Sequence, residues 1–211
     1  MNPLTKYREH KLPVSFYRHH NVCLVARRLL GKYLVTCFEG NLTAGRIVET
    51  EAYAGHTDRA SHAWNGRFTE RTAVMYEPGG LAYVYLCYGI HHLFNVVTHE
   101  AGTPHAVLIR GIEPVAGHDV MLARMQKKQM DISIGRGPGN VSKALGIMVR
   151  HTQTDLQSDV LFLADGGSAI RSADILVTPR IGVDYAGEDA LLPYRFCLKG
   201  HPQVSGKKTM R

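Results

Sequence analysis

Residues 81–92 read LAYVYLCYGIHH, and residues 93–98 continue as LFNVVT. Both halves are rich in aromatic, β-branched and other apolar residues, and Gly89 separates them. The stretch therefore predicts two antiparallel strands joined at Gly89, with Tyr88 at the tip of the hairpin. The strands also hold Tyr83 and Tyr85, although a phenol in a buried strand needs a hydrogen-bond partner for its hydroxyl group. Phenols on one strand face can line a pocket and still form hydrogen bonds at its rim.

Strand-like and helix-like segments lie on both sides of this hairpin. Apolar and β-branched runs predict further strands over residues 32–38, 42–53, 105–114, 160–165, 175–183 and 194–200. Periodicity and capping predict helices over residues 22–29 (capped by Asn21, ended by Gly31), 57–64, 117–128 and 140–147. Helices do not alternate regularly with strands, and no GxGxxG follows a strand, so a doubly wound fold is disfavoured.

The expected fold is therefore α+β, a single mixed domain over residues 1–211 with a largely antiparallel sheet surrounded by helices. We expect residues 1–15 and 203–211 to be flexible ends.

Composition indicates an anionic partner. The chain of 211 residues has 25 Lys and Arg against 18 Asp and Glu, a formal net charge of +7, which attracts nucleic acid before other partners.

The sequence also indicates where the protein works and what it binds. It shows no membrane span and no secretory signal, so we expect an intracellular protein that does not bind membranes. The four cysteines are far apart and are expected to be reduced, buried thiols. No ligand-spaced His/Cys set occurs, so neither a metal nor a cofactor is expected; a zinc site at His19–His20 or His91–His92 is the alternative.

The segment GRIVETEAYAG, residues 45–55, carries two carboxylates at alternating positions. Strand alternation places Gly45, Ile47, Glu49, Glu51 and Tyr53 on one face. Such carboxylates are typical of a solvated strand face, but one of them in a pocket would act as a general base. The segment alone does not decide between these interpretations.

The segment GRGPGNVSKALGI, residues 135–147, resembles a phosphate-binding loop only superficially. It contains neither GxxxxGK[ST] nor GxGxxG, so nucleotide hydrolysis is not expected. Arg136 and Lys143, which we place at a helix N-terminus, are predicted to hold the DNA backbone instead.

Several of these motifs occur together, in order, in one known family. From RIVETEAY (46–53) through ASHAWNGR (60–67), RTAVMYEPGGLAYVYLCYGIHHLFNVV (71–97) and VLIRGIEP (107–114), the chain resembles the alkyladenine (3-methylpurine) DNA glycosylases. The resemblance resumes at residues 135–147 and at PRIGVDYAGE…PYRFCLKG, and spans about residues 20–200. It implies a curved antiparallel sheet with a protruding β-hairpin, similar to the C-terminal domain of formyltransferases.

The resemblance also implies an activity. Such an enzyme is a monomeric, monofunctional DNA glycosylase of base excision repair that needs no cofactor. It flips alkylated or deaminated purines (3-methyladenine, 7-methylguanine, hypoxanthine, ethenoadenine) out of double-stranded DNA. It then hydrolyses the N-glycosidic bond and leaves an abasic site. No lysine falls in the matched pocket where an amine nucleophile would stand, which agrees with a monofunctional enzyme.

The resemblance assigns roles to individual residues. Glu51 matches the carboxylate that activates the attacking water, and Arg110 matches an arginine near it, although the loop before Arg110 differs in length from the family's. The remaining matches are Tyr53, His62 and Tyr85, which sandwich the flipped base; Tyr88, which wedges into the duplex; Asn95, which crowds the 2-amino group of guanine; and Val183, whose main chain lines the pocket.

Several questions stay open in the sequence. Tyr83 is expected to pack or to lie at the pocket rim, Glu49 to orient its neighbours, and His62 to be carried on a helix. A non-catalytic nucleic-acid-binding domain of the same fold and a formyltransferase-like module are the alternative functions. No pattern predicts the preferred lesion or a general acid for neutral bases.

Overall fold

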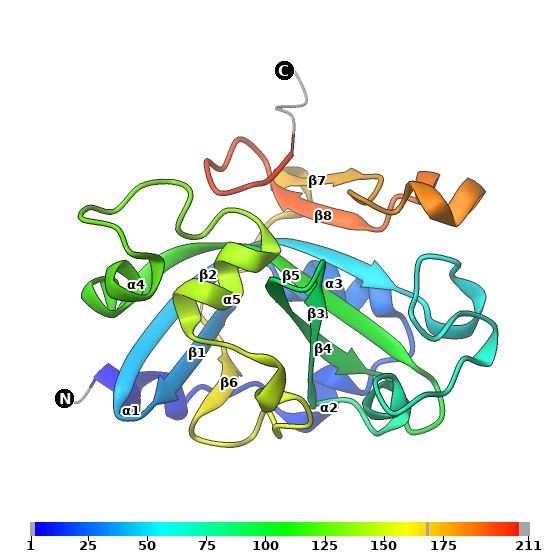
Figure 1. The fold of residues 1–211 in the computed structure, drawn as a ribbon, viewed down its shortest axis with the longest axis horizontal. Helices are drawn as coiled ribbons and strands as arrows, with labels where there is room; N and C mark the ends of the chain where they lie inside the picture. The colour runs from blue at the N-terminus through cyan, green and yellow to red at the C-terminus, as the bar shows by residue number, and fades with distance from the viewer. Residues whose placement is uncertain (1–2, 168, 207–211) are drawn as a thin grey trace.

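Eight strands within the described residues, 3–167 and 169–206 of a computed structural model, form one sheet in which every pair is antiparallel (Figure 1). In hydrogen-bonded order the main path is β3 (Ala82–Cys87), β4 (His91–Thr98), β5 (His105–Ala116), β2 (Asn41–Tyr53), β1 (Tyr33–Phe38) and β6 (Leu161–Ala164). Beyond the end of β1, β8 (Arg195–Leu198) pairs with β2 and carries β7 (Ile175–Thr178). The predicted α+β fold with a largely antiparallel sheet is confirmed.

Helix α3 (Val22–Leu29) covers one face of this sheet. Its N-cap is Asn21, whose Oδ1 accepts a hydrogen bond from the Leu24 amide at 3.0 Å, as the sequence predicts. Its apolar stripe is buried against β2 and β5. On the facing strand, Thr50 Oγ1 donates to the Ala26 carbonyl at 2.9 Å, so Thr50 points toward α3. Its neighbours Glu49 and Glu51 therefore point away from α3.

Helices α4 (His118–Met125) and α5 (Pro138–Leu145) pack on one another, and α5 lies against β4 and β5. The short helices α1 (Pro3–Arg8) and α2 (Val14–Tyr17) begin the described chain.

Two predicted elements differ from the structure. The helix predicted over residues 57–64 is wrong: the chain there makes two 3₁₀ turns, Gly55–Thr57 and Trp64–Gly66, with ordinary turns between them. The strand predicted to continue to residue 183 ends at Thr178, because Pro179 has no amide hydrogen for the ladder.

The pairing of β2 with β5 is irregular at three places, and two of them are β-bulges that flank Glu49. The pairing passes from Ile47↔Ile112 to Glu49↔Gly111 and then to Thr50↔Ile109, so Val48 and Arg110 are each one extra residue in their strand. A bulge interrupts the alternation of side chains and re-aims the residues around it. Ile47, predicted to share a face with the two glutamates, packs in the main core instead.

The chain ends are packed where the structure describes them. Leu12 lies in the main core, and Lys11 forms a β-bridge with Ala164. Near the other end Ser205 is buried and hydrogen-bonded to Glu49. Residues 3–15 and 203–206, expected to be flexible, therefore make specific contacts; residues 1–2 and 207–211 lie outside the described part.

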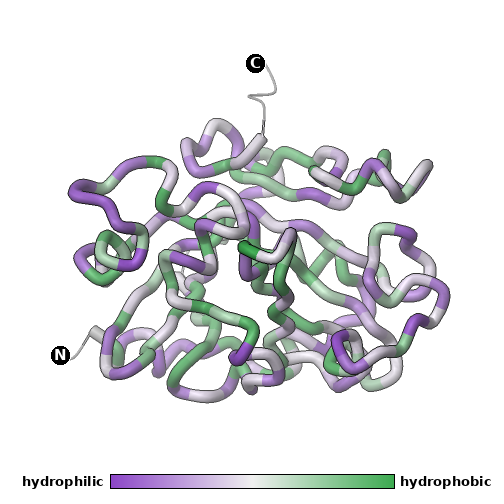
Figure 2. Tube along the Cα trace, in the orientation of Figure 1, coloured by the Kyte–Doolittle hydropathy of each residue, from purple (hydrophilic) through white to green (hydrophobic). Residues whose placement is uncertain are grey.

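Hydrophobic residues concentrate along the central strands, and hydrophilic ones along the outer loops (Figure 2). The cysteines depart from the prediction of four buried thiols: Cys197 is buried, but Cys23, Cys37 and Cys87 are half-buried, and all four are free. Within the described residues, no helix has the length and apolar character needed to cross a membrane.

Candidate active site

The two faces of the central strands have different compositions. Register places Tyr83 of β3 opposite Asn95 of β4, Asn95 opposite Leu108 of β5, and Leu108 opposite Glu51 of β2. Directly opposed residues of an antiparallel sheet point to the same face, so these four form a row across four strands. The alternating neighbours on the other face, Val84, Phe94, Val107 and Ile109, are core residues.

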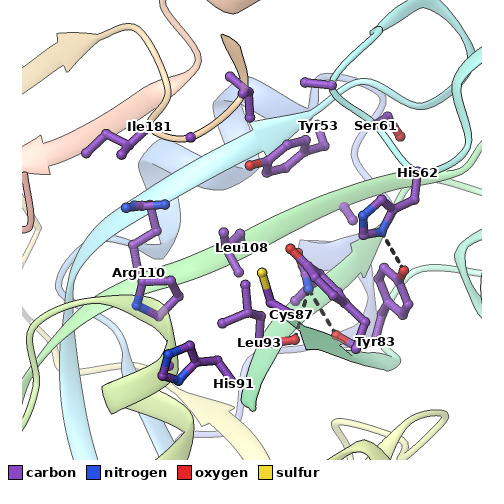
Figure 3. A pocket seen from close by; sticks show the side chains of 18 of the residues that line it. Tyr53, Ser61, His62, Tyr83, Cys87, His91, Leu93, Leu108, Arg110 and Ile181 are labelled. Atoms are coloured by element: carbon purple, nitrogen blue, oxygen red, sulfur yellow. Dashed lines mark hydrogen bonds between the residues drawn. The ribbon is translucent and has the colours of Figure 1, made fainter. Parts of the chain in front are cut away.

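A cavity of about 710 Å³ opens over this row (Figure 3). Aromatic, basic and small residues from β2, β3, β4, β5 and the flanking loops line it. Of the residues predicted to form a site, the lining includes Tyr53, His62, Tyr85, Tyr88, Asn95, Arg110 and Val183.

Glu51 lies directly behind the wall of this cavity, and its side chain is 0% exposed. Its Oε1 accepts a hydrogen bond from the Ile181 amide at 2.8 Å. Its Oε2 accepts from the Tyr53 hydroxyl at 2.9 Å and from Arg110 Nη1 at 3.3 Å. Tyr53, Arg110 and Ile181 all line the cavity. The interpretation of the two carboxylates as a solvated strand face is therefore wrong, and Glu51 is separated from the cavity only by its own donors.

Tyr53 is held on both sides. Burial, followed by the charge of Glu51, raises the pKa of Tyr53 well above its ordinary value, so its hydroxyl group stays protonated and donates. The Arg180 guanidinium lies 4.8 Å from the centre of the Tyr53 ring. Arg180 is fixed in turn by the buried Asp58, with Nη2 to Oδ1 at 2.8 Å. This pair secures the loop that carries Ile181.

His62, Tyr83 and Tyr85 form an aromatic wall opposite Tyr53. His62 Nδ1 lies 2.7 Å from the Tyr83 hydroxyl, a bond visible in Figure 3, and the His62 and Tyr85 ring centres are 4.5 Å apart. His62 sits in a turn between the two 3₁₀ turns, not on a helix as predicted. Tyr83 is 2% exposed, so the expectation that it packs is confirmed, and its hydroxyl group is satisfied by His62.

His62 is uncharged at neutral pH. Burial first, and then the charges of Arg71 and Arg67, lower the pKa of His62 from 6.5 to about 4. The unfolded chain therefore binds this proton more tightly than the folded one. The stability that His62 contributes is complete above pH 6.5 and is lost as the pH falls through about 4.

We expect the free energy of unfolding to fall between neutral pH and about pH 5, and to fall less in His62→Gln, which cannot titrate. Urea unfolding at both pH values measures the difference. His118→Gln, at an exposed position outside the cavity, is measured in parallel as the control. An identical decrease in His62→Gln and wild type would show that this imidazole does not titrate as described.

Asn95 is a rigid part of the pocket wall. It is 3% exposed, and its Nδ2 donates to the main-chain carbonyls of Tyr83 and Leu93, both at 3.2 Å. This is the geometry of a buried strand amide bonded to neighbouring main chain, and the same side chain also lines the cavity. Because both of its amide hydrogens have acceptors, the side chain cannot rotate away without breaking them.

Tyr88 stands at the tip of the β3–β4 hairpin and is 90% exposed. Tyr88 and Gly89 have φ values of 50° and 73°, and the Ile90 amide bonds to the Cys87 carbonyl at 3.2 Å. Two successive left-handed residues are typical of the tight turn that suits a hairpin, and they are unfavourable for a tyrosine. The strained turn presents the ring to solvent beside the cavity.

The two predicted backbone-binding residues lie apart from each other. Arg136 precedes α5, and its Nη2 donates to the Gly206 carbonyl at 3.2 Å. Lys143 is exposed but sits in the last turn of α5, not at its N-terminus as predicted. The helix begins at Pro138, so Lys143 is one and a half turns along it.

Three contributors to the site lie outside the residues that the sequence predicted. Ile181 acts through its amide, which carries no side-chain signal; it lies two positions before the predicted Val183. The Asp58–Arg180 pair joins positions 122 apart in the chain, and Ser205 joins Glu49 from 156 positions away. For these residues the sequence offered one signal: Arg180 and Ile181 belong to RIGV (residues 180–183), which is part of a motif that matches the family.

A buried carboxylate and guanidinium beside an aromatic cavity form a site that suits a flat, ring-shaped group. The family model described as Methylpurine-DNA glycosylase (MPG) matches residues 15–202 of this chain. The chain belongs to this family, as its motifs predict. It is accordingly a DNA glycosylase, a DNA-repair hydrolase that acts on the N-glycosidic bond, and DNA is its substrate.

Two relatives illustrate the extent of the match. A protein of Chlamydia felis (strain Fe/C-56) named "Putative 3-methyladenine DNA glycosylase" is 46% identical over 188 residues, which cover 89% of this chain and 95% of that protein. A protein of the same name from Bacillus cereus (strain G9842) is 45% identical over 203 residues, which cover 92% of this chain and 98% of that protein.

Proposed function

We propose that this glycosylase flips an alkylated or deaminated purine into the cavity and hydrolyses its glycosidic bond with water activated by Glu51. The observation that carries the proposal is the position of Glu51, wholly buried and bonded to three groups that line an aromatic cavity. A buried carboxylate next to a cavity is placed to act as a general base on a water molecule that enters that cavity.

Water reaches Glu51 by replacing one of its three donors. The Tyr53 hydroxyl is suited to this exchange, since its ring forms the wall of the cavity and its bond to Oε2 is a single contact. The carboxylate accepts the proton of the water as the oxygen attacks the anomeric carbon. The same negative charge stabilises the positive sugar of the transition state. Arg110 holds the carboxylate in place during this step.

The aromatic walls suit a purine that carries positive charge. Methylation at N3 or N7 makes the base cationic, and a cation over a tyrosine ring gains roughly 0.5–2 kcal/mol. His62 is neutral at pH 7, since its pKa is about 4, so it does not repel such a base. For the same reason His62 is not the acid that protonates neutral hypoxanthine or ethenoadenine.

Two further features support a monofunctional enzyme that acts as a monomer. No lysine lies among the described residues that line the cavity, so an amine nucleophile is not at hand and the product is an intact abasic strand. The groups around Glu51 all come from one chain, so a second copy is not needed to complete the site.

Tyr88 is suited to fill the gap that the flipped base leaves, because it is an exposed ring on a rigid turn beside the cavity. Tyr88→Ser should slow excision of hypoxanthine paired with cytosine by roughly tenfold or more, because extruding a paired base costs a few kcal/mol. Excision of an unpaired hypoxanthine should change less.

Tyr88→Phe keeps the ring and serves as the matched control. Single-turnover rates for the paired and unpaired substrates measure the effect. Equal rates for Tyr88→Ser and wild type on both substrates would remove Tyr88 from the role of wedge.

The proposal is tested by incubating the protein with duplexes that contain different damaged purines and identifying the free bases by chromatography. We expect release of methylated purines and of hypoxanthine, with abasic strands that stay unbroken until treated with alkali. Release of no purine base from any of these duplexes would contradict the proposed function.

A further inference from the structure

Glu49 is the second carboxylate of β2, and the proposed reaction gives it no part. It is wholly buried, and its Oε1 accepts from Arg195 Nε at 2.7 Å and from Arg110 Nε at 3.1 Å. Burial alone would raise the pKa of Glu49. The charges of Arg110 and Arg195, with hydrogen bonds from Ser205 and Arg195, outweigh burial and hold this pKa below its ordinary value. Glu49 is therefore a fixed negative charge.

Ser205, near the end of the described chain, completes this cluster. Its amide donates to Glu49 Oε2 at 2.6 Å, and its hydroxyl group donates to Glu49 Oε1 at 2.9 Å. The same hydroxyl oxygen accepts from Arg110 Nη2 at 3.1 Å. Its carbonyl oxygen accepts from Arg195 Nη2 at 2.6 Å. Main chain and side chain of one residue thus bind all three buried charged groups.

The segment around Ser205, residues 203–206, which we name the C-terminal strap, lies directly on the site. A Cβ on Gly111 would stand 2.9 Å from the Gln203 carbonyl oxygen, so only glycine at 111 lets the strap pass this close. A Cβ on Gly206 would stand 2.8 Å from Ile181 Cδ1. The strap therefore touches both Arg110 and the residue whose amide binds Glu51.

The consequence for Arg110 follows from the geometry of its guanidinium group, a rigid planar fork. Glu49 binds Nε and Ser205 binds Nη2, which leaves Nη1 to meet Glu51 at 3.3 Å. With two of its three nitrogens fixed, the guanidinium cannot turn to form a bidentate pair with Glu51. Such a pair would also engage Oε1, the oxygen that accepts from the Ile181 amide, and would shift the carboxylate relative to the cavity.

We infer that Glu49 and Ser205 are positioning residues, and that the C-terminal strap holds Arg110 so that it makes only a single contact with the catalytic carboxylate. This inference rests on the proposed function, in which Glu51 is the base. Glu49 and Ser205 act on the rate of the chemical step, through Arg110, and not on the affinity for DNA.

The Ser205 hydroxyl group offers the sharpest test. Ser205→Ala removes two of the contacts but keeps the main-chain ones, and should slow single-turnover excision of hypoxanthine by roughly 10- to 100-fold, as small displacements of catalytic groups do. Affinity for a duplex with an abasic-site analogue should stay near the wild-type value. Ser205→Thr keeps a hydroxyl group and should restore most of the rate.

Ser158→Ala is the matched control, since its hydroxyl group bonds only to the main chain of Leu161, outside the cavity. Glu49→Gln should slow excision further. It also leaves two buried guanidinium groups without their shared carboxylate and should lower Tm, so the conclusion is drawn from the Ser205 variants.

A wild-type rate for Ser205→Ala would overturn the inference, and so would an equal loss in Ser205→Thr or a matching loss of DNA affinity. Glu51→Gln is measured alongside. If Glu51→Gln is inactive while Ser205→Ala is unaffected, only the role of the strap fails. If Glu51→Gln is fully active, the proposed function fails and the inference falls with it.

Discussion

Glu51→Gln is expected to slow single-turnover excision by roughly 10²–10⁴-fold or more, because an amide of nearly the same size cannot accept the proton of the attacking water. The three donors around Glu51 make the reason specific. An amide oxygen still accepts from one or two of them, but the amide nitrogen has no basic lone pair to accept a proton, and its N–H groups face donors on that side of the site.

This variant should still bind DNA. Glu51 lies behind the cavity wall and not at its mouth, so the surface that meets the duplex is unchanged. Affinity for abasic-analogue DNA and Tm separate loss of chemistry from loss of fold. Glu113→Gln is the matched control, because Glu113 also pairs with an arginine, Arg46 at 2.9 Å, but outside the cavity. Excision near the wild-type rate by a folded Glu51→Gln protein would show that another group is the base.

Asn95→Ser should make undamaged guanine a detectable substrate. Hypoxanthine and adenine-derived bases carry hydrogen at C2, whereas guanine carries an amino group there. The Asn95 amide is fixed by two main-chain carbonyls, so it cannot yield to that group, and guanine loses roughly 1–3 kcal/mol of binding free energy. That loss corresponds to about tenfold to hundredfold discrimination.

The shorter serine side chain opens this space. Release of guanine is measured from G·T mismatched duplexes, in which the base is extruded most easily, and release of hypoxanthine by the same protein should change much less. Asn41→Ser, at the exposed start of β2, is the control and should release no guanine. If a folded, hypoxanthine-active Asn95→Ser protein also releases none, Asn95 does not discriminate against guanine.

Turn residues, capping residues and apolar runs in the sequence predicted the hairpin, the helix cap and the strands correctly. The hairpin at Tyr88 and Gly89, the cap at Asn21 and the strands of the sheet all follow from residues that are neighbours in the sequence. The turns around His62 could not be predicted in this way, because a 3₁₀ turn has too few residues to show a periodic pattern of apolar side chains. The bulges at Val48 and Arg110 arise from pairing between distant strands, so alternation along one strand could not predict them.

The residues of the site also fall into a group that the sequence predicted and a group that it did not. Residues on the pocket face, such as Tyr85 and Asn95, were predicted through motifs in matched order, and the structure brings them around one cavity. Ser205 was placed in a tail expected to be flexible, because no residue near it signals a partner on β2. Contacts of this kind depend on how the chain returns to the site, which composition and periodicity do not encode.

Whether a damaged purine leaves the duplex and enters this cavity can be seen in a crystal structure of Glu51→Gln bound to a duplex with one hypoxanthine. We expect the purine ring between Tyr53 on one side and His62 and Tyr85 on the other, with the Tyr88 ring in the gap that the base has left. A hypoxanthine still stacked in the duplex, or extruded to a place outside this cavity, would contradict this expectation.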